Sequence, residues 1–267
     1  HLHHINRATG RFVPSAFLRS LGRENITEVQ LGDQVERDVT VLFSDIRDYT
    51  RLSESMTPED NFKFVNAFNK RMGPIIDRHH GFINQYLGDA IMAIFLRRPA
   101  DALEAAIEMQ QEICSYNEAR KQKGRRPIRS GIGFHTGSLI MGIIGDDKRL
   151  DATTISDTVN TASRIENLNK YYGSGILLSQ DSLQRIEGAE RFRFRYLGQV
   201  QMKGKVVPVG IHECFDGDPP DIVAKKAGTL PLFETGLQAY FAKDFAGAAN
   251  ALEELLRESR LRELKYQ

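Results

Sequence analysis

The fold is decided by residues 39–53, which read V-T-V-L-F-S-D-I-R-D-Y-T-R-L-S. The stretch opens with strong strand formers of alternating character, so it predicts a buried or half-buried strand that ends at Ser44 and Asp45. A helix is expected soon after, because Thr57 and Pro58 form a helix start signal. Asp45 then lies at the mouth of a sheet, where a carboxylate needs a cationic neighbour. A lone aspartate in this place would more simply be a turn or cap residue.

A second aspartate, Asp89, follows Gly88 within residues 81–95, G-F-I-N-Q-Y-L-G-D-A-I-M-A-I-F. Two short apolar runs flank the Gly-Asp pair, which predicts a tight hairpin with the pair at its tip. Two aspartates on neighbouring strand ends can bind hard divalent cations through oxygen, and two such ions suit in-line displacement at phosphorus. A Gly-Asp hairpin tip is also common for purely structural reasons, so the pair alone does not fix a function.

The chain has 267 residues, which allows one large or two small domains, and a formal net charge of +1. Acidic and basic residues are interleaved, which gives no electrostatic footprint for nucleic acid, and we expect no nucleic-acid partner. Cys114 and Cys214 are the only cysteines, which favours a reducing, cytoplasmic location over a disulfide framework. No membrane span or signal peptide is visible. Because the chain starts at His1, we interpret it as part of a longer protein, for which membrane attachment stays open.

Three parts are predicted: an N-terminal linker or transducer segment, 1–36, a main domain, 37–216, and a C-terminal helical extension, 217–267. The first part is too poor in apolar residues to fold alone. The last predicts two helices that resemble half a tetratricopeptide-like helical pair. Since at least three such repeats are needed for a stable array, we expect these helices to pack on the domain or on a second copy of it.

Within the main domain, apolar residues at helical spacing predict a helix over 58–80. The hairpin follows over 82–95, and a second helix begins at Asp101. Two strands are expected next, over 128–134 and 139–144, joined by a short turn. The resulting order, βαββαβ, is that of a ferredoxin-like split βαβ core in the α+β class, with helices on one face and additional C-terminal strands and helices.

A third polar group lies on a helix predicted over 156–170, S-D-T-V-N-T-A-S-R-I-E-N-L-N-K, which Ser156 or Asp157 caps. Asn160 and Arg164 are four residues apart and share one helix face. An amide and a guanidinium placed so can orient a sugar and neutralise a phosphate. Taken alone, the pair is more simply an exposed polar helix face.

Five motifs together resemble the catalytic domain of class III nucleotide cyclases, the adenylyl and guanylyl cyclases, in its bacterial type. They are, in the family's order, V-T-V-L-F-S-D-I-R-D-Y-T, Y-L-G-D-A-I-M-A-I-F, G-I-G-F-H-T-G, D-T-V-N-T-A-S-R-I-E and M-K-G-K. The last of them, residues 202–205, is a predicted tight turn that offers the ammonium of Lys203. Each motif is weak alone, but five in this order are specific.

The resemblance implies that Asp45 and Asp89 bind two metal ions, Mg²⁺ or Mn²⁺, and that the backbone carbonyl of Ile46 binds the second ion. The turn over residues 47–50 is expected to present backbone N–H groups to the β- and γ-phosphates. Its substrate-binding residues are Asp48, Tyr49 and Thr50.

On the resemblance, Asn160 orients the ribose and Arg164 stabilises the pentavalent phosphorus. Lys203 matches a lysine that contacts the triphosphate, and Arg129 is expected to assist it. In this family one protomer supplies the metal aspartates and the other supplies the Asn/Arg pair, so a homodimer with two interfacial sites is expected. The implied reaction is attack of the ribose 3′-oxygen of ATP on the α-phosphate, which yields 3′,5′-cyclic AMP and pyrophosphate. An upstream sensor or membrane domain would control it; His135 is interpreted as a structural strand residue.

Three positions depart from the family's usual pattern. Gln85 stands in place of the lysine that donates to adenine, and Thr153 stands at its partner position. A glutamine amide both donates and accepts, so GTP is possible beside ATP as substrate. Asp48 replaces a usual glycine, and its carboxylate should repel phosphate unless it points away or pairs with a cation such as Arg47 or Arg51.

Three alternatives stay open. The first is a guanylyl or dual-specificity cyclase. The second is a non-catalytic cyclase-like module for dimerisation or regulation, although no metal or Asn/Arg residue is lost. The third is a polymerase-palm-like nucleotidyl transferase, which would want a basic template channel that the net charge of +1 disfavours.

Overall fold

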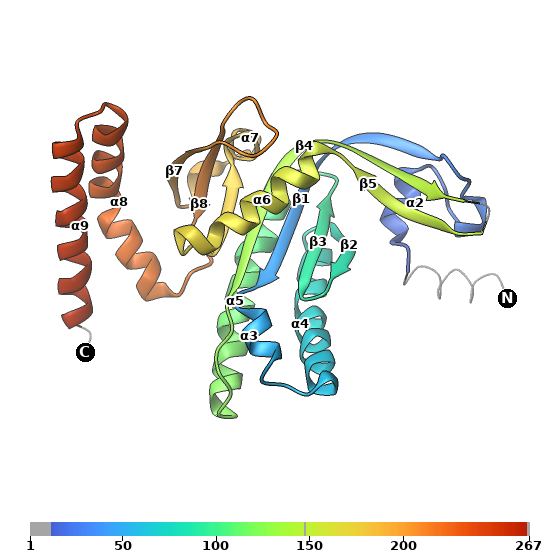
Figure 1. Ribbon diagram of the computed structural model, residues 1–267, viewed down its shortest axis with the longest axis horizontal. Helices are drawn as coiled ribbons and strands as arrows, with labels where there is room; N and C mark the ends of the chain where they lie inside the picture. Colours follow the sequence, from blue (N-terminus) through green and yellow to red (C-terminus); the bar gives the residue numbers. More distant parts are fainter. Residues whose placement is uncertain (1–11, 147, 266–267) are drawn as a thin grey trace.

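The computed structural model describes residues 12–146 and 148–265, and within them one mixed sheet of eight strands forms the centre (Figure 1). The strand order is β2-β3-β1-β4-β6-β8-β7, with β5 paired to β4; β4 and β6 are parallel and the other pairs antiparallel. The section β2-β3-β1-β4 is the ferredoxin-like core, so this prediction is confirmed. The strands are β1 (Gln34–Ile46), β2 (Gly81–Leu87), β3 (Ala90–Phe95), β4 (Ser130–Gly145), β5 (Leu150–Ile155), β6 (Ile176–Ser179), β7 (Phe194–Val200) and β8 (Val209–Cys214).

Helices cover both faces of this sheet. On one face, α4 (Pro58–Arg78) and α5 (Pro99–Gln122) bury Leu42 and Ile46 of β1. On the other, α6 (Asp157–Tyr172) lies against β4 (Figure 1). The expectation of helices on one face therefore holds only for the two core helices. The Thr57 start signal acts as predicted, because Thr57 Oγ1 accepts the Asp60 N–H at 3.1 Å and caps α4.

The remaining helices lie around this core. They are α2 (Ser15–Ser20), η1 (Ile26–Glu28), α3 (Tyr49–Ser53), α7 (Gln180–Gln184), η2 (Ala189–Arg191), α8 (Pro220–Phe241) and α9 (Phe245–Lys265). The last two pack against each other, and α8 reaches the sheet, where Lys226 Nζ lies 2.6 Å from the buried Glu213 Oε1 of β8. In the part of the chain that the structure describes, no helix is both long and apolar enough to cross a membrane.

The predicted turn between two strands near Thr136 is wrong, because β4 is one continuous strand from Ser130 to Gly145. Every residue of β1 finds a partner along β4, from Gln34 opposite Gly142 to Ile46 opposite Ser130. Thr136 is held inside the sheet by hydrogen bonds of its hydroxyl to Thr40 and Ser182, each 2.9 Å long. The long-range ladder thus overrides a local turn signal. The far ends of β1, β4 and β5 continue beyond the core as an arm (Figure 1).

Two glycines of β4, Gly133 and Gly137, let α6 approach the sheet closely, and a third, Gly131, lies beneath the Arg47 side chain. Gly131, Gly133 and Gly137 share one face of the strand, because side chains alternate across it. A Cβ on Gly133 would lie 2.2 Å from the backbone nitrogen of Glu166 in α6, and one on Gly137 would lie 2.7 Å from Thr158 Oγ1. No side chain fits between helix and strand there, so the glycines fix the height of α6 above the sheet.

We predict that Gly133→Ala destabilises the domain by about 1–3 kcal/mol, because the added methyl group meets helix backbone that cannot rotate away. The melting temperature should fall by about 3–10 °C. Gly73→Ala in α4 is the matched control, since its Cβ would meet only Ile83 Cδ1 at an ordinary 3.6 Å. Equal melting temperatures for the two variants in a thermal scan would contradict the close-packing interpretation.

Candidate active site

Two carboxylates meet where β1 ends beside the β2–β3 hairpin. Asp45 is the last residue but one of β1, and the neighbouring Ser44 pairs with Ile91 of β3. Asp89 lies at the hairpin tip after Gly88, whose φ of 68° suits the turn. Burial first, and then a hydrogen bond to Asp45 and repulsion from its charge, raise the pKa of Asp89 to about 7. The chain therefore holds two acidic groups together, and no cationic side chain of the described residues forms an ion pair with either.

The donor set of this pair fits a hard divalent cation that takes further ligands from a substrate. The described residues contain no cluster of three or more His, Cys, Asp or Glu side chains that could enclose a metal. Nor is Asp45 or Asp89 ion-paired within this part of the chain. Mg²⁺ sites in proteins typically have one or two carboxylate ligands, and water and phosphate oxygens take the remaining coordination positions of the ion. Ile46 lies beside the pair and its N–H lowers the pKa of Asp89, but the role of its carbonyl stays a prediction.

The turn after Asp45 offers fewer N–H groups than expected. The Arg47 N–H donates to the carbonyl of Arg129 at 2.8 Å, so it cannot bind phosphate. Asp48 has a left-handed φ of 56° and precedes the short helix α3, in which Tyr49 donates to Asn61 Oδ1 at 2.9 Å. The N–H groups of residues 48–50 remain the candidates at the start of α3.

The partner expected for Asp48 was wrong. Its carboxylate does not pair with Arg47 or Arg51 but lies 3.4 Å from Nη2 of Arg129, and both side chains are largely exposed. Arg129 was predicted independently to assist at the triphosphate. Such an exposed pair contributes little to stability, but it offsets the negative charge that Asp48 adds to the turn.

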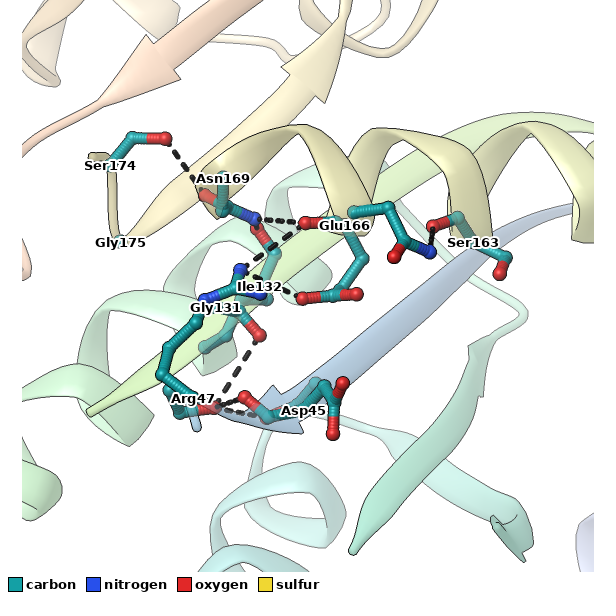
Figure 2. Close-up of polar contacts among 12 residues, drawn as sticks. Asp45, Arg47, Gly131, Ile132, Ser163, Glu166, Asn169, Ser174 and Gly175 are labelled. Atoms are coloured by element: carbon teal, nitrogen blue, oxygen red, sulfur yellow. Dashed lines mark hydrogen bonds and ion pairs between the residues drawn. The ribbon is translucent and has the colours of Figure 1, made fainter. Parts of the chain in front are cut away.

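A buried ion pair that the sequence analysis missed joins the end of β1 to α6 (Figure 2). Nη2 of Arg47 lies 2.8 Å from Oε1 of Glu166 and 3.3 Å from its main-chain oxygen. Asn169 donates to the same main-chain oxygen and to that of Ile132, each at 3.0 Å. Burial raises the pKa of Glu166 to about 7, although Arg47 opposes this shift. An Arg and a Glu so far apart in the chain give no local sequence signal.

The exposed face of α6 brings the fourth and fifth motifs together. Ser156 caps the helix by accepting the Val159 N–H at 3.3 Å. Arg164 Nη1 donates to the carbonyl of Lys203, so Arg164 and the turn over residues 202–205 are neighbours. Asn160 is exposed on the same helix. A second tie, Lys205 Nζ to Asp157 Oδ2 at 3.0 Å, holds the turn to the start of α6.

In one chain, the aspartate pair and the polar face of α6 do not meet. Along β1, Asp45 pairs with Gly131, whereas Val39 pairs with Gly137, against which the start of α6 packs. Six strand residues separate these places, which is about 20 Å. Arg164 and Glu166 are about 200° apart around the helix, so Arg164 points away from the side on which Glu166 meets Arg47.

Gln85 and Thr153, the two residues expected near the purine base of the substrate, are both accessible to solvent. Gln85 is exposed on the edge strand β2 and lines a surface pocket of 520 Å³ together with Tyr86. Thr153 is partly exposed on β5, opposite Gly142. His135 is buried, with Nδ1 2.7 Å from Ser179 Oγ, and burial lowers its pKa to about 4, as fits a structural residue.

Comparison with known proteins gives one consistent match. Residues 32–215 match the family model described as the adenylate and guanylate cyclase catalytic domain. An adenylate cyclase of Anabaena cylindrica is 41% identical over 209 residues, 76% of this chain and 42% of that protein. The terminal-differentiation specific adenylate cyclase of Dictyostelium discoideum is 35% identical over 244 residues, 88% of this chain and 11% of that protein. The chain thus spans less than half the length of these relatives.

Solved structures of nucleotide cyclases also match this chain. The adenylyl cyclase CyaB from P. aeruginosa superposes with a TM-score of 0.60 at 28% identity, over 68% of this chain and 95% of that one. A guanylyl cyclase superposes with a TM-score of 0.58 at 31% identity, over 69% of this chain and 94% of that one.

The raised pKa of Asp89 predicts a pH-dependent stability in the metal-free protein. The folded chain holds a proton up to about pH 7 that the unfolded chain releases near pH 4, so stability should fall as pH rises between these values. Asp89→Asn removes this contribution. In EDTA, its melting temperature relative to the unsubstituted protein should therefore be higher at pH 7.5 than at pH 5. Asp151→Asn on exposed β5 is the control. A constant difference across pH would contradict the prediction.

Proposed function

The chain belongs to the adenylate and guanylate cyclase catalytic domain family, and on that premise we propose that it converts ATP into 3′,5′-cyclic AMP and pyrophosphate. The observation that carries the proposal is the close pair of Asp45, at the end of β1, and Asp89, at the β2–β3 hairpin tip, on the fold of this family. The named relatives that are 41% and 35% identical are both adenylate cyclases, which favours ATP.

In the proposed reaction, the ribose 3′-hydroxyl gives up its proton to water and its oxygen forms a bond to the α-phosphorus, while the bond from the α-phosphorus to the bridging oxygen breaks and pyrophosphate leaves. Asp45 and Asp89, with the Ile46 carbonyl, would hold two Mg²⁺ or Mn²⁺ ions. When bound, such ions lower the pKa of the attacking hydroxyl and neutralise the leaving pyrophosphate. The backbone N–H groups of Asp48, Tyr49 and Thr50 would bind the β- and γ-phosphates.

The second half of the site lies on α6 and the turn at residues 202–205. Asn160 would orient the ribose, and Arg164 would neutralise charge that develops on the α-phosphate in the transition state. The hydrogen bond from Arg164 to the Lys203 carbonyl supports a common place for both cations. Lys203 and Arg129 would contact the triphosphate, with Asp48 balanced by Arg129.

We propose that a homodimer completes the site, since the two halves lie apart in one chain. Apolar side chains are exposed where a partner would cover them. Tyr86 and Leu87 of β2 are 53% and 46% exposed, and Ile144 and Ile155 of the arm are 49% and 59% exposed. Two such chains would form two sites, each with the aspartates of one protomer and the Asn/Arg pair of the other. In a longer protein, this domain would be the cytoplasmic output of an upstream sensor.

A complementation experiment tests function and assembly together. Asp45→Ala and Arg164→Ala should each reduce cyclic AMP formation from ATP at least about a hundredfold, because each removes a charge needed in the transition state. Mixed in equal amounts after dissociation, they should recover about a quarter of the normal activity, since half of the dimers then carry one intact site.

The matched control mixes Asp45→Ala with Asp89→Ala, which damage the same half and should not complement. Near-normal turnover by either aspartate variant would contradict the metal assignment. A verified heterodimer of Asp45→Ala and Arg164→Ala that stays inactive would contradict the shared site.

The exposed Gln85 predicts modest base discrimination. Its amide can donate to adenine N1 or accept from guanine N1–H, and a mismatched buried donor costs about 1–3 kcal/mol, or about one to two decades in rate ratio. Gln85→Lys should raise the ratio of kcat/KM for ATP over GTP, and Gln85→Glu should lower it. Gln85→Leu, which neither donates nor accepts, should reduce both values with little change in their ratio. A ratio that is equal in all four proteins would mean that Gln85 does not face the base.

A further inference from the structure

Arg47 lies close to the carboxylate pair but is turned away from it. Asp45 lies on the same side of β1 as Val41 and Phe43, which pack with Ala162 of α6, so it projects from the face of the sheet that α6 covers. Arg47, in the turn after β1, reaches Glu166 of α6 on the same face. The Arg47 side chain crosses directly above Gly131, where a Cβ would lie 1.5 Å from its Nη2. Figure 2 shows the guanidinium directed at Glu166 on α6 and the Asp45 carboxylate pointing elsewhere.

Glu166 is the group that holds Arg47 there. Its side chain is 5% exposed, that of Arg47 is 16% exposed, and their charged atoms lie 2.8 Å apart. The Glu166 Oε1 receives no aligned hydrogen bond, so charge attraction dominates the contact with the carboxylate. The attraction within such a buried ion pair is largely offset by the free energy of removing both charges from water, so the pair adds little to the stability of the fold. Fold stability is therefore a weak explanation for placing a glutamate here.

The chemistry of the neighbouring carboxylates supplies a better explanation. A guanidinium stays charged at all relevant pH values and binds carboxylates through a rigid fork of donors. Asp45 and Asp89 repel each other and have no cationic partner in the described chain, so a free Arg47 would gain by pairing with Asp45. That pairing would compete directly with a divalent cation for the same oxygens.

We propose that Glu166 is a positioning residue for the metal site: it draws Arg47 across Gly131 and so keeps Asp45 free to bind a divalent cation. The inference rests on the proposed role of Asp45 and Asp89 as metal ligands. It assigns a task in metal binding to a helix whose other face carries Asn160 and Arg164.

The test is direct Mn²⁺ binding, measured by titration calorimetry on the full chain without nucleotide. Glu166→Gln should weaken Mn²⁺ binding about tenfold or more, as loss of a residue that orients a metal ligand does. Arg47→Met should bind Mn²⁺ at least as tightly as the unsubstituted protein, and Arg47→Met with Glu166→Gln should match Arg47→Met. This rescue separates the proposal from a structural role, for which the double variant would bind no better than Glu166→Gln.

Gly131→Ala should also release Arg47 from Glu166, because its methyl group would occupy the space through which the Arg47 side chain passes. It should weaken Mn²⁺ binding, and Arg47→Met should restore it. Glu213→Gln on β8 is the control, since it breaks other buried ion pairs, to Arg195 of β7 and Lys226 of α8, and should lower the melting temperature without changing Mn²⁺ affinity.

The outcomes separate the inference from the function on which it rests. Mn²⁺ binding that is absent, or that Asp45→Asn leaves unchanged, would overturn the metal site and the inference with it. Binding that depends on Asp45 but is weakened by Arg47→Met, or not weakened by Glu166→Gln, would overturn the role of Glu166 alone.

Discussion

The close contact between α6 and the glycine face of β4 is the constraint on which the rest of the structure depends. With Gly133 beneath the backbone of Glu166, the helix has one permitted height above the sheet. That height puts Glu166 within 2.8 Å of Arg47 on one side. On the other side it presents Arg164 to the carbonyl of Lys203. Both halves of the proposed site thus take their position from a strand that contributes little chemistry itself.

A second constraint is electrostatic. The end of β1 and the β2–β3 hairpin bring two carboxylates together, and burial first, then the hydrogen bond to Asp45 and repulsion from its charge, raise the pKa of Asp89 to about 7. Burial also raises the pKa of a third carboxylate, Glu166, to about 7; Arg47 opposes this shift and Asp45 adds to it. Three carboxylates this close together repel one another, and bound cations would remove that repulsion. Arg47 lies beside these carboxylates, and in the described chain it forms its ion pair with Glu166 and not with the aspartates. This distribution of charge fits a site whose missing positive charge arrives with metal ions.

Much of the architecture could be predicted because its signals are local. The Gly88–Asp89 tip, the Thr57 cap of α4 and the Ser156 cap of α6 each depend on a few adjacent residues. The ferredoxin-like strand order followed from the sequence of elements, since such an arrangement has few ways to bury its apolar faces. The motif residues were likewise assigned from the sequence, and their roles remain proposals.

The sequence by itself determined which residues carry the charges, where the capped helices α4 and α6 begin and which strands make the core. Only the tertiary structure decided that β4 runs unbroken through Thr136, that Asp48 pairs with Arg129, and that Arg47 reaches Glu166. Each of these joins residues far apart in the chain, and their energies depend on distances of a few ångströms that no periodicity encodes. Local sequence preferences determine where helices and strands form. Which charged side chains pair with one another is determined only when α6 packs on the sheet.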